Sequence, residues 1–423
     1  NGITNAVDIA AGENHSVALM ADGTVYAWGS NESGQIGHQQ KASSVYGTNA
    51  SEHYNVPVIV TDFGETKHLE SIVGISAGGN HTSALTKSGV VYTWGRNVNS
   101  QLGMNDTNPA DRYDVPREVL GDADSEFKYN VAKISAGDEH TAALSQNGNV
   151  WTWGYNYYGR LGDGSGETRA MPGKVVTALN YETFDLEGIV DIDAGITHSL
   201  AIAADGSIYA WGDNMYGELG DGTKAQKSTA VKVVNEDGSD FSGANGISAG
   251  NEHSVLFTNM GEIYTWGHND YGQLGLGNAS IVVSTPQKVE SLPEIVSISA
   301  GKQHTMVLGA DGYVYSFGDN SLGQLGAPSK DTSRRSSTPV VAQGLNKVIS
   351  ISIGAGGSAT KAVRYDGTLW GWGENSNHQI DNTNNRYYAY PVQIDLGDEF
   401  NGHILRTYDG LYHVVAMLDN GRI

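Results

Sequence analysis

Short apolar segments separated by turn signals recur along the whole chain and predict β-strands. A first segment ends in a small residue and glycine, as in ISAG at 75–78. A second is apolar on both faces, as in HSVAL at 15–19, which is typical of a strand buried on both sides. A third, of the pattern VYxWG at 25–29, alternates aromatic and smaller apolar residues, so each kind lies on one face. The pattern predicts an all-β fold.

Turn and edge signals complete the repeating unit. Asp22-Gly23 and Asn147-Gly148 lie between the second and third segments and predict two-residue type I′ hairpins, because these residues accept a positive φ. The unit then closes with Asn-x-x-Gly-Gln-Leu-Gly or a variant, as in NDYGQLG at 269–275. A last strand near a proline follows, as at Val56-Pro57-Val58, and proline suits an outer edge strand. We therefore expect four strands in each unit.

A histidine at the start of the second segment marks each unit. The series is His15, His81, His140, His198, His253, His304 and His413, with Ala359 in the seventh place. Its spacing drifts, as loop insertions between separate blades would cause. Seven units contain both the hairpin and the aromatic-glycine strand, and an eighth begins near His403 and stops at Ile423. The sequence predicts one domain over 1–423, with a partial eighth repeat unit at 403–423.

Together these motifs resemble the repeat of the regulator of chromosome condensation family over essentially the whole chain. The resemblance implies a β-propeller, usually of seven four-stranded antiparallel blades. We expect seven blades; eight remains an alternative if residues outside this sequence complete the last unit. The chain is also similar to bacterial propellers of this type, including the propeller-type β-lactamase inhibitory protein.

Charge and composition restrict the partners. The chain has 25 Lys and Arg against 47 Asp and Glu, a formal net charge of −22, and no basic cluster, which argues against a nucleic-acid partner. Apolar runs are too short for membrane insertion. The absence of cysteine excludes disulfides and thiol chemistry, and it favours an exported bacterial protein. We expect a secreted or cell-surface protein in which this is a monomeric domain of a larger chain.

Catalytic and metal motifs are weak, so we expect no enzyme activity, no cofactor and no metal site. The histidines lie one per blade and cannot converge, so we expect them to bond buried backbone groups. Ser76 and Ser248 match Gly-x-Ser-x-Gly, but a second strand follows them where a nucleophile elbow needs a helix. The Asp-rich turn at 381–385 lacks the spacing and closing glutamate of a calcium loop.

The residues that vary between units are better candidates for recognition. Three consecutive units carry tyrosine in the Asn-x-x-Gly loops, and rigid aromatic side chains on loops are typical anchors of protein interfaces. The alternative is that these tyrosines only cover loop backbone. The candidate partner-binding residues are Tyr155, Tyr157, Tyr158, Met215, Tyr216 and Tyr271.

These features favour a non-enzymatic scaffold that binds a protein or glycan through rim loops. Inhibition of an enzyme is the main alternative, because the family includes an inhibitory propeller. Guanine nucleotide exchange is a weaker one, since no loop here matches an exchange surface. A structural spacer in a larger adhesin is the last. Long insertions at 38–55, 104–114 and 381–390 are further candidate binding loops.

Overall fold

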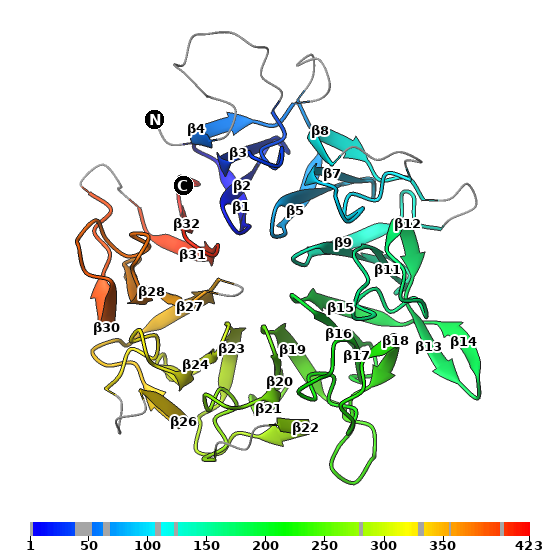
Figure 1. Cartoon of the computed structure of the whole chain (residues 1–423). Coiled ribbons are helices and arrows are strands. Elements are labelled where there is room, and N and C mark those ends of the chain that lie inside the picture. Colours follow the sequence, from blue (N-terminus) through cyan, green and yellow to red (C-terminus); the bar gives the residue numbers. More distant parts are fainter. Residues whose placement is uncertain are drawn as a thin grey trace.

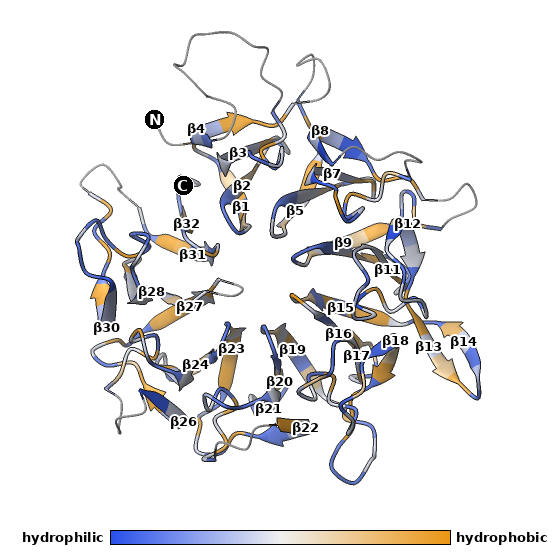
Figure 2. Cartoon of the chain, in the orientation of Figure 1, coloured by the Kyte–Doolittle hydropathy of each residue, from blue (hydrophilic) through white to orange (hydrophobic). Residues whose placement is uncertain are grey.

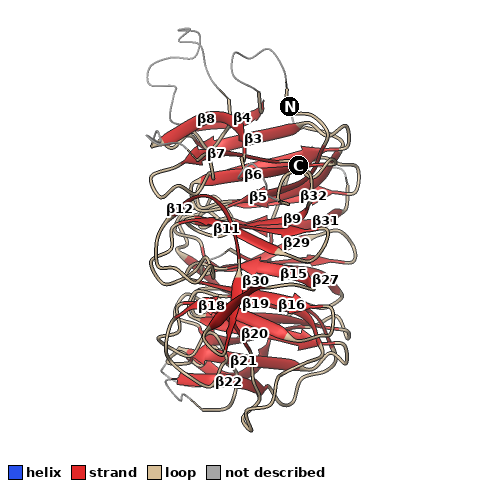
Figure 3. Cartoon of the chain, turned by 90° about the vertical axis from the view of Figure 1, so that its right-hand side faces the viewer, coloured by secondary structure: helices blue, strands red, loops and turns tan. Residues whose placement is uncertain are grey.

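The computed structural model describes residues 3–38, 53–61, 68–105, 111–121, 126–278, 282–328, 334–354, 357–397 and 402–423. Four-stranded antiparallel sheets are arranged like spokes around a central axis (Figure 1). The described residues form strands, loops and turns without a helix (Figure 3). The fold is a seven-bladed β-propeller, which confirms the expected fold class.

The strands of the first four blades follow one another in sequence. Blade one contains β1 (Ala6–Ala11), β2 (His15–Met20), β3 (Val25–Ser30) and β4 (His53–Ile59). Blade two contains β5 (Ile72–Ala77), β6 (His81–Thr86), β7 (Val91–Arg96) and β8 (Arg112–Glu118). Blade three contains β9 (Val131–Ala136), β10 (His140–Ser145), β11 (Val150–Gly154) and β12 (Arg169–Lys174). Blade four contains β15 (Ile189–Ala194), β16 (His198–Ala203), β17 (Ile208–Gly212) and β18 (Lys227–Lys232).

The remaining strands complete the ring. Blade five contains β19 (Ala244–Ala249), β20 (His253–Thr258), β21 (Ile263–His268) and β22 (Val282–Lys288). Blade six contains β23 (Ile295–Ala300), β24 (His304–Gly309), β25 (Val314–Asp319) and β26 (Arg335–Val341). Blade seven contains β27 (Val348–Ile353), β28 (Ala359–Arg364), β29 (Leu369–Glu374) and β30 (Tyr387–Gln393). Two hairpins lie outside this pattern, β13 (Val176–Leu179) with β14 (Glu182–Asp185), and β31 (Ile404–Asp409) with β32 (Val414–Leu418).

In every blade the first strand lies nearest the axis, and in every blade except blade four the fourth strand lies outermost (Figure 1). The proline-bearing strands β4, β8 and β30 are outer strands, as the sequence predicts. The β13–β14 hairpin, which the repeat pattern does not predict, pairs in parallel with β18 and extends blade four to six strands.

Hydrophobic residues recur along the strands (Figure 2), and buried side chains of neighbouring blades form shared core clusters. The second strand is buried at every residue in most blades, as in β2 and β10. Trp94 of blade two packs on Val17 and Val25 of blade one, and it is fully buried. The aromatic-glycine strand therefore joins neighbouring blades, as expected of a strand with apolar residues on both faces.

The histidine of one blade bonds the next blade. His15 Nε2 lies 2.9 Å from Thr82 Oγ1, and both residues are buried. The histidines are structural, as expected, but their partner is a side-chain hydroxyl and not the backbone group that we expected. The other five pairs, at 2.9–3.4 Å, are His81 with Thr141, His140 with Ser199, His198 with Ser254, His253 with Thr305, and His304 with Thr360.

The glutamine of the closing motif contributes its main-chain carbonyl to the same joint. Gln35 O accepts hydrogen bonds from Thr82 Oγ1 at 3.0 Å and from Trp94 Nε1 at 2.9 Å. Gln101 O accepts from blade three in the same way. One carbonyl oxygen thus satisfies two buried donors of the next blade, which explains why tryptophan recurs there.

The first strand and its glycine also have structural roles. Ser76 Oγ accepts a hydrogen bond from Ala136 N of the next blade at 2.9 Å, so this serine joins neighbouring blades. A Cβ on Gly78 would lie 2.3 Å from His81 Cε1. This position therefore excludes any side chain, as the sequence predicts.

The hairpin turns differ from the expected type I′. Gly23 has a φ of +82°, whereas Asp22 does not adopt a positive φ. Gly23 N donates to Met20 O, and Met20 N donates to Thr24 O, both at 2.9 Å. This is a three-residue loop with a glycine bulge, in which only the last residue needs the left-handed conformation.

The β31–β32 hairpin lies between blade seven and blade one and closes the ring (Figure 1). Ala6 N donates to Gly421 O at 2.9 Å, and Arg406 pairs with Asp8 at 3.2 Å. At the joint with blade seven, Ala359 replaces the histidine and Lys361 Nζ instead lies 3.1 Å from Asp409 Oδ1. Both charged side chains are buried, and burial raises the pKa of Asp409 although Lys361 opposes this.

Candidate recognition surface

The candidate tyrosines lie on loops at one end of the blades. The first residue of each second strand pairs with the glycine at or next to the end of the third strand, as His140 does with Gly154. The loop after the third strand therefore lies beside the loop between the first two strands, and Tyr155 N donates to Glu139 O at 3.1 Å. Both kinds of loop form one face of the propeller.

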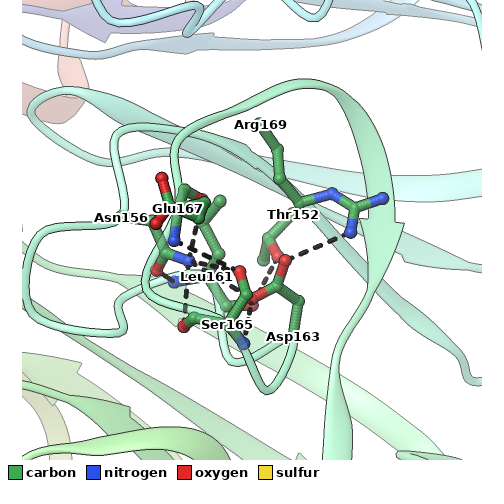
Figure 4. Close-up of polar contacts among 7 residues, drawn as sticks. All are labelled: Thr152, Asn156, Leu161, Asp163, Ser165, Glu167 and Arg169. Carbon is green, nitrogen blue, oxygen red and sulfur yellow. Dashed lines mark hydrogen bonds and ion pairs between the residues drawn. The ribbon is translucent and has the colours of Figure 1, made fainter.

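One buried asparagine fixes each of these loops (Figure 4). In blade three, Asn156 Oδ1 accepts from Leu161 N at 3.0 Å, and Asn156 Nδ2 lies 3.1–3.2 Å from oxygen atoms of Asp163, Ser165 and Glu167. The loop conformation thus depends on Asn156 and leaves the next residues free to face solvent. The same bond, to the main-chain NH five residues later, is made by Asn31, Asn97, Asn214, Asn269, Asn320 and Asn375.

The tyrosines of blade three surround an arginine. Tyr155 and Tyr157 stack with their ring centroids 6.1 Å apart, and Tyr158 meets Tyr157 edge-on at 4.6 Å. The Arg160 guanidinium lies 4.9 Å from the Tyr155 ring and 5.8 Å from the Tyr158 ring. Arg160 is buried and donates to Ile196 O of blade four at 3.0 Å. The hydrogen bond from Arg160 to Ile196 O thus anchors this group of aromatic rings to blade four.

The tyrosines of blades four and five meet at a histidine. The Tyr216 ring stacks on His268 with centroids 4.2 Å apart, and Tyr271 approaches the same imidazole edge-on at 6.3 Å. His268 Nδ1 lies 2.9 Å from Glu252 Oε2, and Nε2 lies 3.2 Å from Asp270 Oδ2. Hydrogen bonding to Glu252 raises the pKa of His268, against the opposing effect of burial, so a proton on this imidazole is favoured.

Five of the six predicted residues therefore form two clusters. Tyr155, Tyr157 and Tyr158 lie together on blade three, and Tyr216 and Tyr271 meet at His268 across blades four and five. The sixth residue, Met215, precedes Tyr216 on the same loop. Tyr157 is 63% exposed and Met215 is 60% exposed. The sequence predictions missed Arg160 and His268. Arg160 could have been found because it replaces the repeat glutamine, but nothing in the repeat pattern pointed to His268.

The structure describes the long insertions only in part. Residues 39–52 and 106–110 lie outside the described residues. In the insertion at 381–390, Asn375 Nδ2 lies 2.9 Å from Asp381 Oδ1 and from Asn385 O. These oxygen atoms therefore bind the blade's own asparagine. Over the described residues, no cluster of three His, Asp or Glu side chains is arranged to hold a metal ion.

The central channel forms a cavity of about 720 Å³, lined mostly by glycine, alanine and serine, with six acidic residues and one lysine among them. Glu13 and Asp138 lie on its loops at the end that carries the tyrosines. Burial, together with Glu13 and Glu139, raises the pKa of Asp138 to about 6. The recognition surface therefore adjoins a negatively charged channel mouth.

Comparisons with known proteins agree with this architecture. The sequence profile of the RCC1-like domain matches residues 1–354. Ultraviolet-B receptor UVR8 of Arabidopsis thaliana is 31% identical, over 88% of this chain and 78% of that protein. Regulator of chromosome condensation of Homo sapiens is 28% identical, over 84% and 82%. The chain spans only 7% of the E3 ubiquitin-protein ligase HERC2 of Homo sapiens, to which it is 31% identical.

Solved structures show the same fold. Human WBSCR16 superposes with a TM-score of 0.71 at 20% identity, covering 94% of this chain and all of that one. Prp20p of Saccharomyces cerevisiae, described with its binding to Gsp1p and histones, gives 0.70 at 21% identity over 98% and 92%. No helix in the described part of this chain could span a membrane. The sequence relatives named above are from a plant and from human, and bacterial origin and export stay predictions. Because the profile covers most of the chain and a 31% identical relative aligns over most of both proteins, the chain belongs to the RCC1-like domain family.

Proposed function

We propose that the chain is a non-enzymatic scaffold that binds a protein partner through the tyrosine rim, defined as Tyr155, Tyr157, Tyr158, Met215, Tyr216 and Tyr271. The observation that carries this proposal is the exposure of Tyr157 and Met215, at 63% and 60%, on neighbouring loops that buried asparagines hold in place. Large side chains on rigid loops lose little entropy on binding and are typical interface anchors.

The placement of reactive groups supports a non-catalytic role. The histidines that pair with serine or threonine are closed off from solvent between blades. Prp20p, which shares the fold, is described as binding proteins. Binding of an enzyme's active site by the rim, the inhibitory alternative, and binding of a glycan are narrower versions of the same proposal.

The proposal is tested by capture of partners from the source organism and its surroundings. The bait is the chain, beside a variant with Tyr157, Tyr158, Tyr216 and Tyr271 changed to alanine. We expect a partner retained by the chain and lost by the variant. Protease and glycosidase treatment of the captured material distinguishes a protein from a glycan, and the partner's identity distinguishes an inhibitor from an adhesin.

A matched control separates the rim from general loss of tyrosine. Tyr129, Tyr181 and Tyr365 are exposed outside the rim, and their triple alanine variant should retain the partner. Both variants must unfold cooperatively like the parent chain. Equal retention by the rim variant and the parent would leave the tyrosines as loop cover and favour a spacer.

We also propose that the protein is exported or held at the cell surface. The absence of cysteine over 423 residues and the charge of −22 support this location. Fractionation of source cells with an antibody to the chain tests it, and recovery from the cytosol alone would contradict it.

A further inference from the structure

The joint between blades four and five lacks a hydrogen-bond donor that the joint between blades one and two contains. In the latter, Gln35 Nε2 donates to Asn80 Oδ1 at 3.3 Å. The same two repeat positions are Glu218 and Glu252 in blades four and five. Ionised carboxylates only accept hydrogen bonds, so neither side chain can supply the missing donor while both are ionised.

Glu218 is buried, and only one of its two carboxylate oxygens accepts a hydrogen bond. The side chain is fully buried, and Glu218 Oε2 accepts from Tyr216 N at 2.9 Å. Glu218 Oε1 is buried without a hydrogen-bond partner. An unpaired buried acceptor is costly, which makes this atom a candidate ligand contact.

Negative charge gathers around the Tyr216 ring. Glu252 raises the pKa of Tyr216 most strongly, followed by burial and by Glu218, Asp270 and Asp213. In the described part of the chain, no lysine or arginine forms an ion pair with any of these four carboxylates. His268 thus pairs with two of these four acidic residues, Glu252 and Asp270.

The neighbouring blade shows which cation fits. Arg160 occupies the repeat position of Glu218 one blade earlier, and its guanidinium lies between the rings of Tyr155 and Tyr158. Glu139 and Asp138 interact electrostatically with this guanidinium. The chain therefore already places a planar cation between aromatic rings and carboxylates on this face. The described carboxylates are not arranged to hold a metal ion, which favours an organic cation.

We propose that Glu218 and Tyr216 form a binding site for an arginine side chain of the partner, a site that rests on the proposed function. The guanidinium donates to Glu218 Oε1 and to the Glu252 carboxylate and lies against the Tyr216 ring. Arginine suits this site better than lysine, because its planar group presents five donors and also stacks on aromatic rings. The negative charge of the rim and channel mouth favours the approach of such a partner.

The test uses the peptide acetyl-Gly-Gly-Arg-Gly-Gly-amide and the same peptide with citrulline or lysine. The chain is labelled with ¹³C-carboxyl glutamate, and the Glu218 signal is assigned by its loss in Glu218→Gln. Burial raises the pKa of Glu218 to about 7, and the arginine peptide should lower it, by about one unit at ten times its dissociation constant. The uncharged citrulline peptide should leave the pKa unchanged.

Glu218→Gln restores the residue that most blades carry here, so we expect it to fold. At pH 8 it should bind the arginine peptide at least tenfold more weakly than the parent. Glu236→Gln, which removes the same charge at an exposed site, should bind like the parent. The site would be overturned if parent and Glu218→Gln bound the arginine peptide equally, or if the parent bound the arginine and citrulline peptides equally. If the parent bound the lysine peptide as tightly as the arginine peptide, the preference for guanidinium would be overturned. A partner lost by the tyrosine variant but kept by Glu218→Gln would leave the proposed function standing without the arginine site.

Discussion

The imidazole of His15 and the hydroxyl of Thr82 lie 2.9 Å apart although the residues belong to different blades. Thr82 also donates to Gln35 O, so Thr82→Val removes two hydrogen bonds and leaves the buried His15 Nε2 unpaired, whereas Gln35 O still accepts from Trp94 Nε1. We expect the free energy of unfolding to fall by about 1–3 kcal/mol. Urea denaturation measures the change. Thr183→Val on an exposed strand is the control, and an equally small effect of both changes would contradict a structural role for the joint.

The free energy of unfolding should fall as the pH is lowered below 6.5, the pKa of free histidine. Burial lowers the pKa of His198 to about 4 and that of His253 to about 3, from 6.5. Below pH 6.5 the unfolded chain binds protons that the folded chain excludes. The contribution is therefore complete above pH 6.5 and is lost as the pH falls towards 4. Urea midpoints between pH 7.5 and 4.5 test this, and midpoints that do not fall over this range would contradict it.

Glu218 should have the opposite pH dependence. Its folded pKa of about 7 exceeds the usual 4.5, so its contribution to stability is lost as the pH rises from 4.5 to 7. Glu218→Gln should therefore stabilise the chain more at pH 8 than at pH 5, by roughly 3 kcal/mol. Thermal or urea unfolding of both proteins at both pH values gives the difference. An equal effect at pH 5 and pH 8 would show that Glu218 titrates normally.

Removing one member of the buried Lys361–Asp409 pair should destabilise the fold strongly, whereas replacing both members by apolar residues should cost little. Other blades carry apolar residues such as Val17 or Met306 at the position of Lys361, and alanine such as Ala77 at that of Asp409. Lys361→Met alone leaves a buried carboxylate unpaired and should cost about 3–5 kcal/mol. The double variant with Asp409→Ala should recover most of that loss. A double-mutant cycle measured by urea denaturation gives the coupling free energy between Lys361 and Asp409. Additive losses of unfolding free energy in the single and double variants would contradict this coupling.

Much of the fold could be predicted because the repeat is local in sequence. Three segments indicate their structural environment by their own residues: the Ala-Gly pair, the buried second strand and the aromatic-glycine strand. Because the unit occurs eight times, the pattern is clear. The turn type was wrong because Asp-Gly suits both a type I′ turn and the bulged turn at Gly23, and the choice depends on strand register. The β13–β14 hairpin was missed because it belongs to one blade only.

The candidate surface could be predicted only in part. Variation at Tyr157 and Met215 marked positions that the fold leaves free, and both side chains are exposed. The histidine partner was misassigned because Thr82 lies 67 residues from His15, and a repeat period does not reveal which side chains meet across blades. The role of Glu218 depends on its burial and on Glu252, neither of which a motif conveys.

The closing joint of the ring gives the propeller a preferred place to open. Six joints share the same histidine link, whereas blade seven uses Ala359 with the Lys361–Asp409 pair, and His413 Nε2 lacks a hydrogen-bond partner. Trp28, unlike Trp94, is only partly buried, and it packs against the cluster that contains Val415 and Met417 of β32. The amide protons of β31 and β32 should therefore exchange with solvent before those of the other blades. Under a pulling force, the ring should open first at this joint and become a linear array of blades.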